Sequence, residues 1–390
     1  MRQLVKTKSL IDGTGADAAP DAAFLIVNGV IEDVGPLNKF SDLSPETEEL
    51  DLTDFIVMPG LINSHTHLSI IPALGDQLGQ MRGAPVPKTL KSIANLAKDV
   101  RSGVTTSRIM GEEHFIDFDI RDAIAAGHIE GPRLIVAGVP LAASNGHGVA
   151  LTVSDGIAEV QKNARKNLAR GADFLKIFAT GGLSTPRPAA TACTYSLVEI
   201  AAAVEEAKRS DTYVAAHAHG GLGVDLCIEG GVRTIEHGAM LDERQIEQII
   251  KKDMWVIATS SILYSPEGIE KTDFNIPAIK EKVLAAREVV RGNLSKVVAS
   301  GANMAIGTDS IHGEMPFEME CMVSFGASNM RAILAATREG AKACRVEDKL
   351  GTIEKGKLAD FIALRKNPLE DIRNIRSVER VYKGGRQLQA

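Results

Sequence analysis

The sequence predicts an α/β fold: a (β/α)8 TIM barrel with a small β-sandwich domain formed by the N- and C-terminal segments. Between about Pro59 and Leu350, eight short runs rich in β-branched residues alternate with amphipathic helical stretches, a pattern typical of a parallel sheet. Eight such units in about 290 residues fit the usual size of a (β/α)8 barrel, about 250 residues. Both ends of the chain are instead rich in strand-like runs, which predicts the second domain.

The two chain ends consist of short strands separated by turns. Near the N-terminus, Asn28-Gly29 lies between two apolar runs and is a strong signal for a two-residue hairpin. Near the C-terminus, Gly384-Gly385 marks a similar turn. Because chain ends commonly lie close together, we expect both ends to build one domain. The expected division is a β-sandwich domain of residues 1–57 plus 351–390 and a barrel of residues 58–350.

The middle of the chain carries the predicted barrel. Its helices include residues 86–103, 154–171 and 196–210, and several end in glycine, as helix C-termini often do. A doubly wound open sheet is the alternative, but no GxGxxG motif opens a helix after the first strand. The predicted strands are residues 57–65, 104–110, 133–138, 173–180, 213–219, 232–238, 254–260 and 303–309.

Composition indicates a cytoplasmic enzyme. Apolar residues make up 44% and charged residues 24% of the 390 residues, and the net charge is −6. No basic tract suggests nucleic acid, no 18-residue apolar run suggests a membrane span, and the N-terminus lacks a signal-peptide core. The cysteines show no CxxC spacing and are expected to be reduced thiols: Cys193, Cys227, Cys321 and Cys344.

Polar residues fall at the ends of several predicted barrel strands, where TIM barrels carry their chemistry. His65 and His67 are two positions apart, so both imidazoles can face the barrel mouth. Each residue alone has an ordinary explanation: a lone histidine is often a hydrogen-bonded core residue, and Asp309 could cap the next helix. Their joint occurrence favours a site. The candidates are His65, His67, Lys176, His217, His237 and Asp309.

Lys176 is the most informative of these residues. It lies in the apolar run FLKIF, where an unpaired ammonium would be strongly disfavoured. Reaction with carbon dioxide would convert it to a carbamate, an anionic ligand with two oxygens that can bridge two divalent cations. Imidazole and carboxylate-type ligands suit zinc and similar metals. Two such ions about 3.5–4 Å apart hold a bridging hydroxide, so the residues predict a metal-assisted hydrolase.

Several motifs extend this prediction over nearly the whole chain: PGLINSHTHL, KIFATGG, AHAHG, IEHG, GTDS and LGTIEKGKLADFIAL. With these motifs the chain resembles the amidohydrolase superfamily and, within it, the prolidase-like branch of Xaa-Pro dipeptidases and related enzymes. The resemblance implies two divalent metal ions, expected to be Zn²⁺. His65, His67 and Asp309 would bind the more buried ion and His217 and His237 the second, and N6-carboxylysine at Lys176 would bridge them. Asp309 would also be catalytic, moving a proton from the hydroxide to the leaving amine.

The substrate is expected to be a small amide, dipeptide-like or an N-acyl amino acid. The loop after the first barrel strand, IIPALGDQLGQMRGAPVP, is apolar and favours a hydrophobic or aromatic group. Family resemblance and loop position suggest five substrate-binding candidates. They are His147, His219, Tyr195, His312 and Arg187.

Two other functions remain as alternatives. One is a deaminase or a cyclic-imide or imidazolone hydrolase of the same superfamily. Mononuclear relatives of that kind carry glutamate three residues after the strand-5 histidine, where this chain has Gly220, and they lack the strand-4 lysine. The other is a metal-free, non-enzymatic paralogue, which would be expected to have lost ligands that are all present here. By analogy with such relatives, a homo-oligomer is expected.

Overall fold

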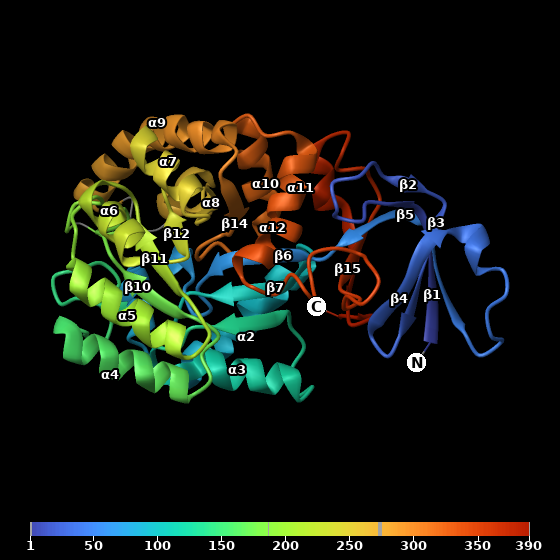
Figure 1. Cartoon of the computed structure of the whole chain (residues 1–390), viewed down its shortest axis with the longest axis horizontal. Coiled ribbons are helices and arrows are strands. Elements are labelled where there is room, and N and C mark those ends of the chain that lie inside the picture. Colours follow the sequence, from blue (N-terminus) through green and yellow to red (C-terminus); the bar gives the residue numbers. More distant parts are fainter. Residues whose placement is uncertain (1, 186, 272–274, 390) are drawn as a thin grey trace.

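The computed structural model describes residues 2–185, 187–271 and 275–389. One eight-stranded sheet combines both ends of the chain, in the order β17-β16-β15-β5-β1-β3-β4, with β2 paired to β1. Figure 1 shows its blue N-terminal strands at one end of the molecule, next to β15. Its strands are β1 (Arg2–Leu10), β2 (Ala19–Pro20), β3 (Ala22–Val27), β4 (Val30–Pro36), β5 (Glu48–Pro59), β15 (Phe361–Leu364), β16 (Val378–Lys383) and β17 (Arg386–Gln387).

Both predicted hairpin turns are confirmed. Asn28 and Gly29 join β3 to β4 with φ angles of 51° and 83°, and Gly384 and Gly385 join β16 to β17 with φ angles of 58° and 76°. Two successive positive φ angles are the geometry of a type I′ turn, which asparagine and glycine adopt most readily.

The predicted sandwich is a single curved sheet. The start of β4 meets the segment before β15, where Ile31 N donates to Lys357 O at 2.8 Å. The strands can close in this way because apolar side chains fill the inside of the curve. The Phe361 ring lies edge-on to Phe24 at 5.1 Å between centroids and stacks on Tyr382 at 4.4 Å.

Parallel strands make up the rest of the β structure and form two sheets, β6-β7-β8 and β14-β13-β12-β11-β10-β9. An isolated parallel bridge between Thr66 and Asp309 links β6 to the segment after β14. All eight predicted strands are present, and β9 is an additional short one. They are β6 (Leu61–Thr66), β7 (Val104–Ile109), β8 (Arg133–Val136), β9 (Leu141–Ala142), β10 (Leu175–Phe178), β11 (Val214–Ala218), β12 (Thr234–His237), β13 (Trp255–Ala258) and β14 (Asn303–Ile306).

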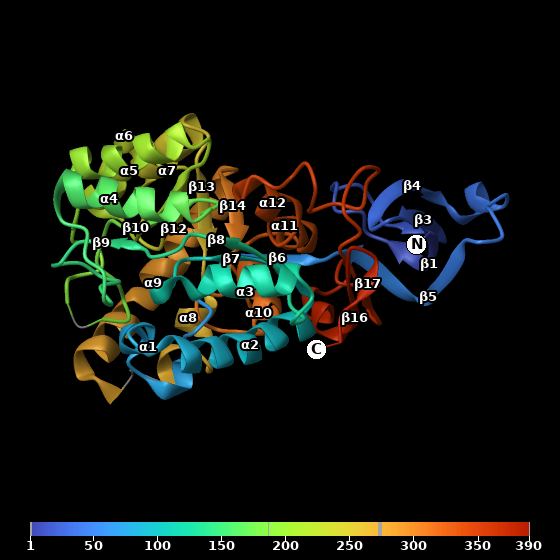
Figure 2. The ribbon, with the colours of Figure 1, turned by 90° about the horizontal axis from the view of Figure 1, so that it is seen from below.

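Helices follow most of these strands and cover them (Figures 1 and 2), giving a TIM-barrel-type α/β fold. Local sequence explains where several begin: α5 and α7 each open on a capping box, Ser196 with Glu199 and Asp242 with Gln245. The helices are α1 (Gln77–Met81), α2 (Pro85–Arg101), α3 (Ile116–Ala125), α4 (Gly156–Ala169), α5 (Leu197–Arg209), α6 (Gly221–Gly230), α7 (Glu243–Lys251), α8 (Ser261–Tyr264), α9 (Pro277–Ser300), α10 (Met315–Ser324), α11 (Asn329–Ala335) and α12 (Arg338–Ala343).

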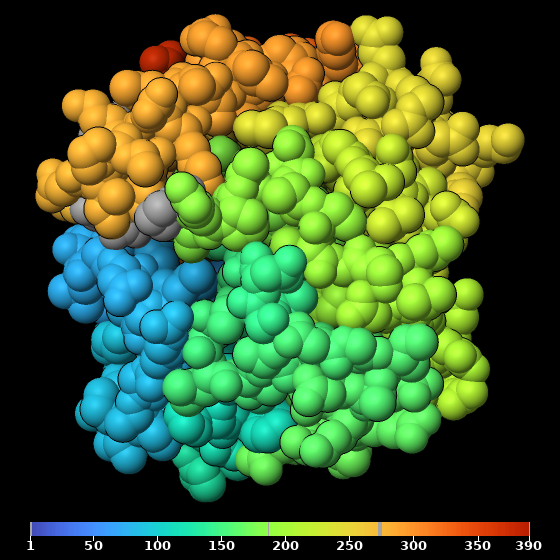
Figure 3. Space-filling view, turned by 90° about the vertical axis from the view of Figure 1, so that its left-hand side faces the viewer, coloured from blue at the N-terminus to red at the C-terminus, as the bar shows by residue number. Residues whose placement is uncertain are grey.

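The central parallel strands are buried on both faces, as expected where helices cover a parallel sheet. The loops that follow them come together at one end of the molecule, which Figure 3 views directly. Polar residues at the ends of the strands are thereby brought together under these loops. Within the described ranges, no helix combines the length and apolar character needed to cross a membrane.

Candidate active site and metal centre

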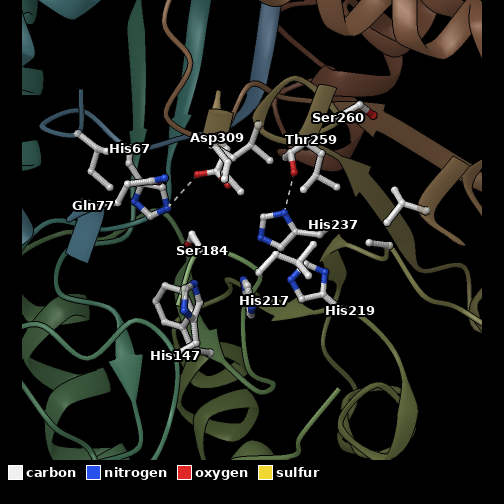
Figure 4. Close-up of a pocket in the computed structure, with 18 of the residues that line it drawn as sticks. His67, Gln77, His147, Ser184, His217, His219, His237, Thr259, Ser260 and Asp309 are labelled. Carbon is white, nitrogen blue, oxygen red and sulfur yellow. Dashed lines mark hydrogen bonds and ion pairs between the residues drawn. The ribbon is translucent and has the colours of Figure 1, made fainter. Parts of the chain in front are cut away.

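A pocket opens at the carboxyl ends of the parallel strands. Its empty volume is about 730 Å³, including space open to solvent. Histidines cluster on its floor, and Figure 4 shows them with Asp309 around a common centre. The polar lining residues are His67, Gln77, His147, Ser184, His217, His219, His237, Thr259, Ser260 and Asp309.

His65 lies beneath the pocket, at the end of β6. It is 1% exposed, and its Nδ1 lies 2.6 Å from Oε2 of Glu236. Because an ionised carboxylate only accepts hydrogen bonds, Nδ1 carries the proton and Nε2 keeps its lone pair. That Nε2 is buried and has no hydrogen-bond partner among the described residues. An imidazole fixed in this tautomer is prepared to be a metal ligand.

Two further histidines are oriented by hydrogen bonds in the same way. His237 Nδ1 lies 2.6 Å from Oγ1 of Thr259, and His217 Nε2 donates to the carbonyl oxygen of Gly181 at 2.9 Å. The His237 ring lies 4.6 Å from that of His217 and 4.8 Å from that of His65. Burial holds the pKa of all three imidazoles well below its ordinary value. The histidines are therefore neutral, the form that binds metals.

Asp309 approaches the histidines from the loop after β14. Its backbone bridges to β6: Asp309 N donates to His65 O at 2.9 Å, and His67 N donates to Asp309 O at 3.0 Å. The side-chain oxygen Oδ1 lies 3.8 Å from His67 Nε2. Potential ligand atoms of His65, His237 and Asp309 all lie within 4.8 Å of one another. Burial raises the pKa of Asp309 to about 6, an effect that nearby Lys176 partly offsets.

Lys176 projects from β10 and is 1% exposed. Within the part of the chain that the structure describes, its Nζ has no hydrogen-bond partner, and it lies 4.9 Å from the centre of the Phe178 ring. Burial lowers the pKa of Lys176 to about 8, which increases the fraction of neutral amine at neutral pH, the form that reacts with carbon dioxide. An unpartnered amine beside three unprotonated imidazoles and a carboxylate fits a divalent metal group.

A buried ion pair between Arg108 and Glu236 supports His65, and the sequence alone did not predict it. The pair joins Glu236 to Arg108 on β7, whose Nη2 donates to both carboxylate oxygens of Glu236, at 2.8 and 2.9 Å. Both side chains are fully buried, and Arg108 also donates to Ser64 O at 2.6 Å. The available signal was a charged residue within each of two predicted strands of the barrel, VTTSRI and TIEH, both of which are buried. Only the fold shows that the two residues meet.

Replacing Glu236 with glutamine is expected to weaken divalent metal binding by about 10- to 100-fold, because the carboxylate that orients His65 is lost. Competition with a chelating dye would measure the affinity. Glu206→Gln is the matched control, since Glu206 also pairs through both oxygens with an arginine, Arg165, but on α5. The variant Glu236→Gln/Arg108→Met removes the unpaired buried guanidinium and should regain stability while binding metal weakly. Wild-type metal affinity in both Glu236 variants would contradict this role.

Of the five predicted substrate-binding residues, two line the pocket. His219 follows β11, and its ring lies 4.8 Å from that of His217. Its buried Nδ1 has no partner among the described residues. His147 stands on the other side of His217, at 4.7 Å between rings, and its Nδ1 lies 3.1 Å from Oγ1 of Thr185. Both side chains are thus positioned to contact a molecule in the pocket.

The structure does not bring the other three into the pocket lining. The Tyr195 hydroxyl is buried and donates to Ser154 O at 2.8 Å. His312 has both ring nitrogens engaged, one 2.8 Å from Asp99 Oδ2 and the other 2.9 Å from His67 O. Arg187 lies exposed on the loop after β10. Position in a loop near a strand end suggested all three, but hydrogen bonds within the protein hold the first two away.

Comparison with known proteins agrees with this site. The Amidohydrolase family matches residues 56–388. Ochratoxinase of Aspergillus niger is 27% identical over 376 residues, covering 85% of this chain and 75% of that protein. Imidazolonepropionase of Picrophilus torridus is 24% identical over 371 residues, covering 88% and 86%.

Solved structures are similar over the full length of the chain. A Xaa-Pro dipeptidase with bound methionine superposes with a TM-score of 0.90 at 29% identity, covering 100% of both chains. A prolidase complexed with N-methylphosphonate-L-proline gives a TM-score of 0.89 at 26% identity, again covering 100% of both.

These matches show the family of the chain and its branch within that family. The chain belongs to the amidohydrolase family, and it is a hydrolase that acts on C–N bonds of small molecules. Within that family it lies in the prolidase-like branch, which confirms the resemblance seen in its sequence motifs. Members of the family typically bind divalent metals, in keeping with the candidate site of His65, His237 and Asp309.

Proposed function

We propose that the protein hydrolyses the amide bond of a small dipeptide-like or N-acyl amino acid substrate that carries a hydrophobic or aromatic group. One observation carries the proposal: neutral histidines, a carboxylate and an unpartnered buried lysine converge on the floor of a largely apolar pocket. The prolidase-like relatives support the choice of an amide bond.

Two divalent ions, which we take to be Zn²⁺, fit these residues. His65, His67 and Asp309 would hold the more buried ion, His217 and His237 the second, and Lys176 as N6-carboxylysine would bridge them. When bound, such ions supply a Lewis acid and a strong oxygen nucleophile at neutral pH. Carboxylation also explains why Lys176 lies buried with no partner among the described residues, since the carbamate would be held by the metals.

Asp309 is the residue proposed to move the proton. Its carboxylate lies at the edge of the histidine cluster and also lines the pocket, so it can reach both the attacking water and the leaving nitrogen. It would take a proton from the water as the bond to the carbonyl carbon forms, and return it to the amine as the C–N bond breaks. Glu236 and Thr259 act indirectly: the Glu236 carboxylate fixes the tautomer of His65, and the Thr259 hydroxyl holds the His237 ring in place.

The pocket wall supports a hydrophobic substrate group. One part comes from the loop after β6, with Leu78 and Met81, and another from residues before and within α9, including Ile262, Val290 and Leu294. Among the described lining residues, none is lysine or arginine. Such a wall would bury a large apolar group and gain about 25 cal/mol for each Å² removed from water.

A second candidate is deamination or hydrolysis of a cyclic amide, as the names of some relatives suggest. Besides imidazolonepropionase, a 5-methylthioadenosine/S-adenosylhomocysteine deaminase of Desulforudis audaxviator is 23% identical over 414 residues, covering 94% of this chain and 86% of that protein. The glutamate expected for such an activity would stand at Gly220. A Cβ there would meet Met240 O at 2.3 Å, so no side chain fits without movement of the backbone. This geometry favours amide hydrolysis.

The test combines metal analysis with a substrate panel. Protein purified without chelator is expected to contain about two equivalents of divalent metal per chain and to release amine from N-acyl amino acids or dipeptides. Removing the metal should abolish activity, and adding Zn²⁺ should restore it. One equivalent or none would contradict the binuclear assignment. Turnover of imidazolone or adenosine compounds alone would favour the second candidate.

A further inference from the structure

The loop after β6 is held in place by a buried ion pair. Ser69 donates to both carboxylate oxygens of Glu112, from its N at 2.9 Å and from its Oγ at 2.7 Å. Lys88 Nζ pairs with the same carboxylate at 2.9 Å and donates to Met81 O at 3.0 Å. Lys88 and Glu112 are 1% and 0% exposed. Both ends of the segment 69–81 are therefore fixed to α2 and to the segment after β7.

Helix α1 lies within this fixed loop and carries two glutamines with different roles. The Gln80 amide is fully used within the loop: Nε2 donates to Ile71 O and Gly75 O at 3.0 and 2.8 Å, and Oε1 accepts from Ile71 N at 3.0 Å. Gln77, one helical turn earlier, instead lines the pocket. Gln80 therefore shapes the loop, and Gln77 is the glutamine presented to a bound molecule.

Gln77 has one amide atom held and the other free to bind. It is 6% exposed, and its Oε1 accepts a hydrogen bond from Ser310 Oγ at 3.1 Å. Its buried Nε2 has no partner in the part of the chain that the structure describes. A buried amide N–H₂ without an acceptor is unfavourable, so this group is complementary to a ligand oxygen. Because Ser310 follows Asp309 directly, the bond to Ser310 fixes the amide close to the Asp309 side of the pocket.

Figure 4 shows Gln77 beside His67 and on the opposite side of the cluster from His219. In the proposed function Asp309 returns its proton to the leaving nitrogen, so Gln77 stands on the amine side of the scissile bond. None of the described lining residues is lysine or arginine. This side of the pocket therefore offers a neutral donor, the Gln77 amide, to an oxygen of the substrate.

We propose that Gln77 Nε2 donates a hydrogen bond to a carboxylate or carbonyl oxygen on the amine part of the substrate. Gln77 is thereby a specificity-determining residue that selects amino acid amines over simple amines. The inference rests on the proposed amide hydrolysis and names the substrate class within it.

The experiment compares two amides that differ only in the α-carboxylate of the amine part: N-benzoyl-L-phenylalanine, which carries it, and N-benzoylphenethylamine, which has hydrogen in its place. The wild-type enzyme should prefer the first. Gln77→Leu should lower kcat/KM for N-benzoyl-L-phenylalanine by roughly 10- to 100-fold, mainly through KM, because a hydrogen bond to a charged group is lost. Turnover of N-benzoylphenethylamine should change by less than about threefold, since the amine part of that substrate carries no oxygen for Gln77 to bind. Gln77→Glu should lower kcat/KM for the carboxylate substrate further, by charge repulsion.

Gln80→Leu is the matched control, because it alters a glutamine of the same helix that does not line the pocket. Any change in loop shape should affect the two amides equally in this variant. Equal losses for both amides in Gln77→Leu, with circular dichroism unchanged, would overturn the role of Gln77. If the metal-loaded wild type hydrolyses neither amide nor any other in the panel, the proposed function itself fails, and the inference fails with it.

Discussion

Replacement of Lys176 by alanine is expected to reduce bound metal from about two equivalents per chain to one or none, and to lower hydrolysis by about 10³-fold or more. The reason is that the proposed bridging ligand disappears while the histidines remain. The buried Nζ has no partner among the described residues whose loss would unfold the protein. Metal content after gel filtration and amine release in the same preparation would measure both effects.

Lys88→Ala is the matched control for Lys176→Ala. Lys88 is also 1% exposed, but its ammonium is fully engaged, with Glu112 and with the carbonyl oxygens of Met81 and Glu113. Its loss should reduce thermal stability and leave the metal stoichiometry at two. Short carboxylic acids added to the Lys176→Ala protein should restore part of the activity by occupying the place of the carbamate. Full activity of Lys176→Ala without additives would show that the carbamate role is wrong.

Replacement of Asp309 by asparagine is expected to lower kcat by about 10²- to 10⁴-fold, because the amide cannot take the proton from water or return it to the amine. Asparagine suits the backbone here: φ at this position is 56°, in the left-handed region that asparagine and aspartate tolerate better than most residues. The fold should therefore survive the change. Steady-state kinetics on a preparation of known metal content would separate loss of proton transfer from loss of metal.

Asp117→Asn provides the comparison for Asp309→Asn. Asp117 is fully buried and accepts a hydrogen bond from Gly138 N at 2.8 Å, but it does not line the pocket. Its kcat should stay within a few fold of wild type. An Asp309→Asn enzyme that retained both metals and wild-type kcat would exclude Asp309 as the proton-transferring group.

Much of the fold could be predicted because its signals are local. The alternation of apolar runs and amphipathic helices predicted the eight parallel strands, and Asn28-Gly29 predicted a hairpin that the positive φ angles confirm. The prediction of a β-sandwich was less accurate, because the strands of both chain ends form one sheet. Whether terminal strands form two sheets or one curved sheet depends on contacts such as that between β4 and the segment before β15, which join residues far apart in the chain.

Part of the candidate site could also be predicted from the sequence. Strand position alone predicted that His65, His217 and His237 lie at strand ends, and the two-residue spacing of His65 and His67 predicted that both imidazoles can face the barrel mouth. An apolar context marked Lys176 as a residue that needs a partner. These features can be predicted from sequence because the carboxyl ends of parallel barrel strands all lie at one face of the barrel.

Only the tertiary structure decided how the buried polar groups pair. It joined Arg108 to Glu236 and Glu236 to His65 across 128 and 171 residues, and it left Gln77 facing the pocket while Gln80 faces its own loop. It also kept Tyr195 and His312 out of the pocket lining through bonds to Ser154, Asp99 and His67. The physical reason is that a buried donor or acceptor takes whichever partner the packed chain brings within about 3 Å, and sequence order does not set that distance.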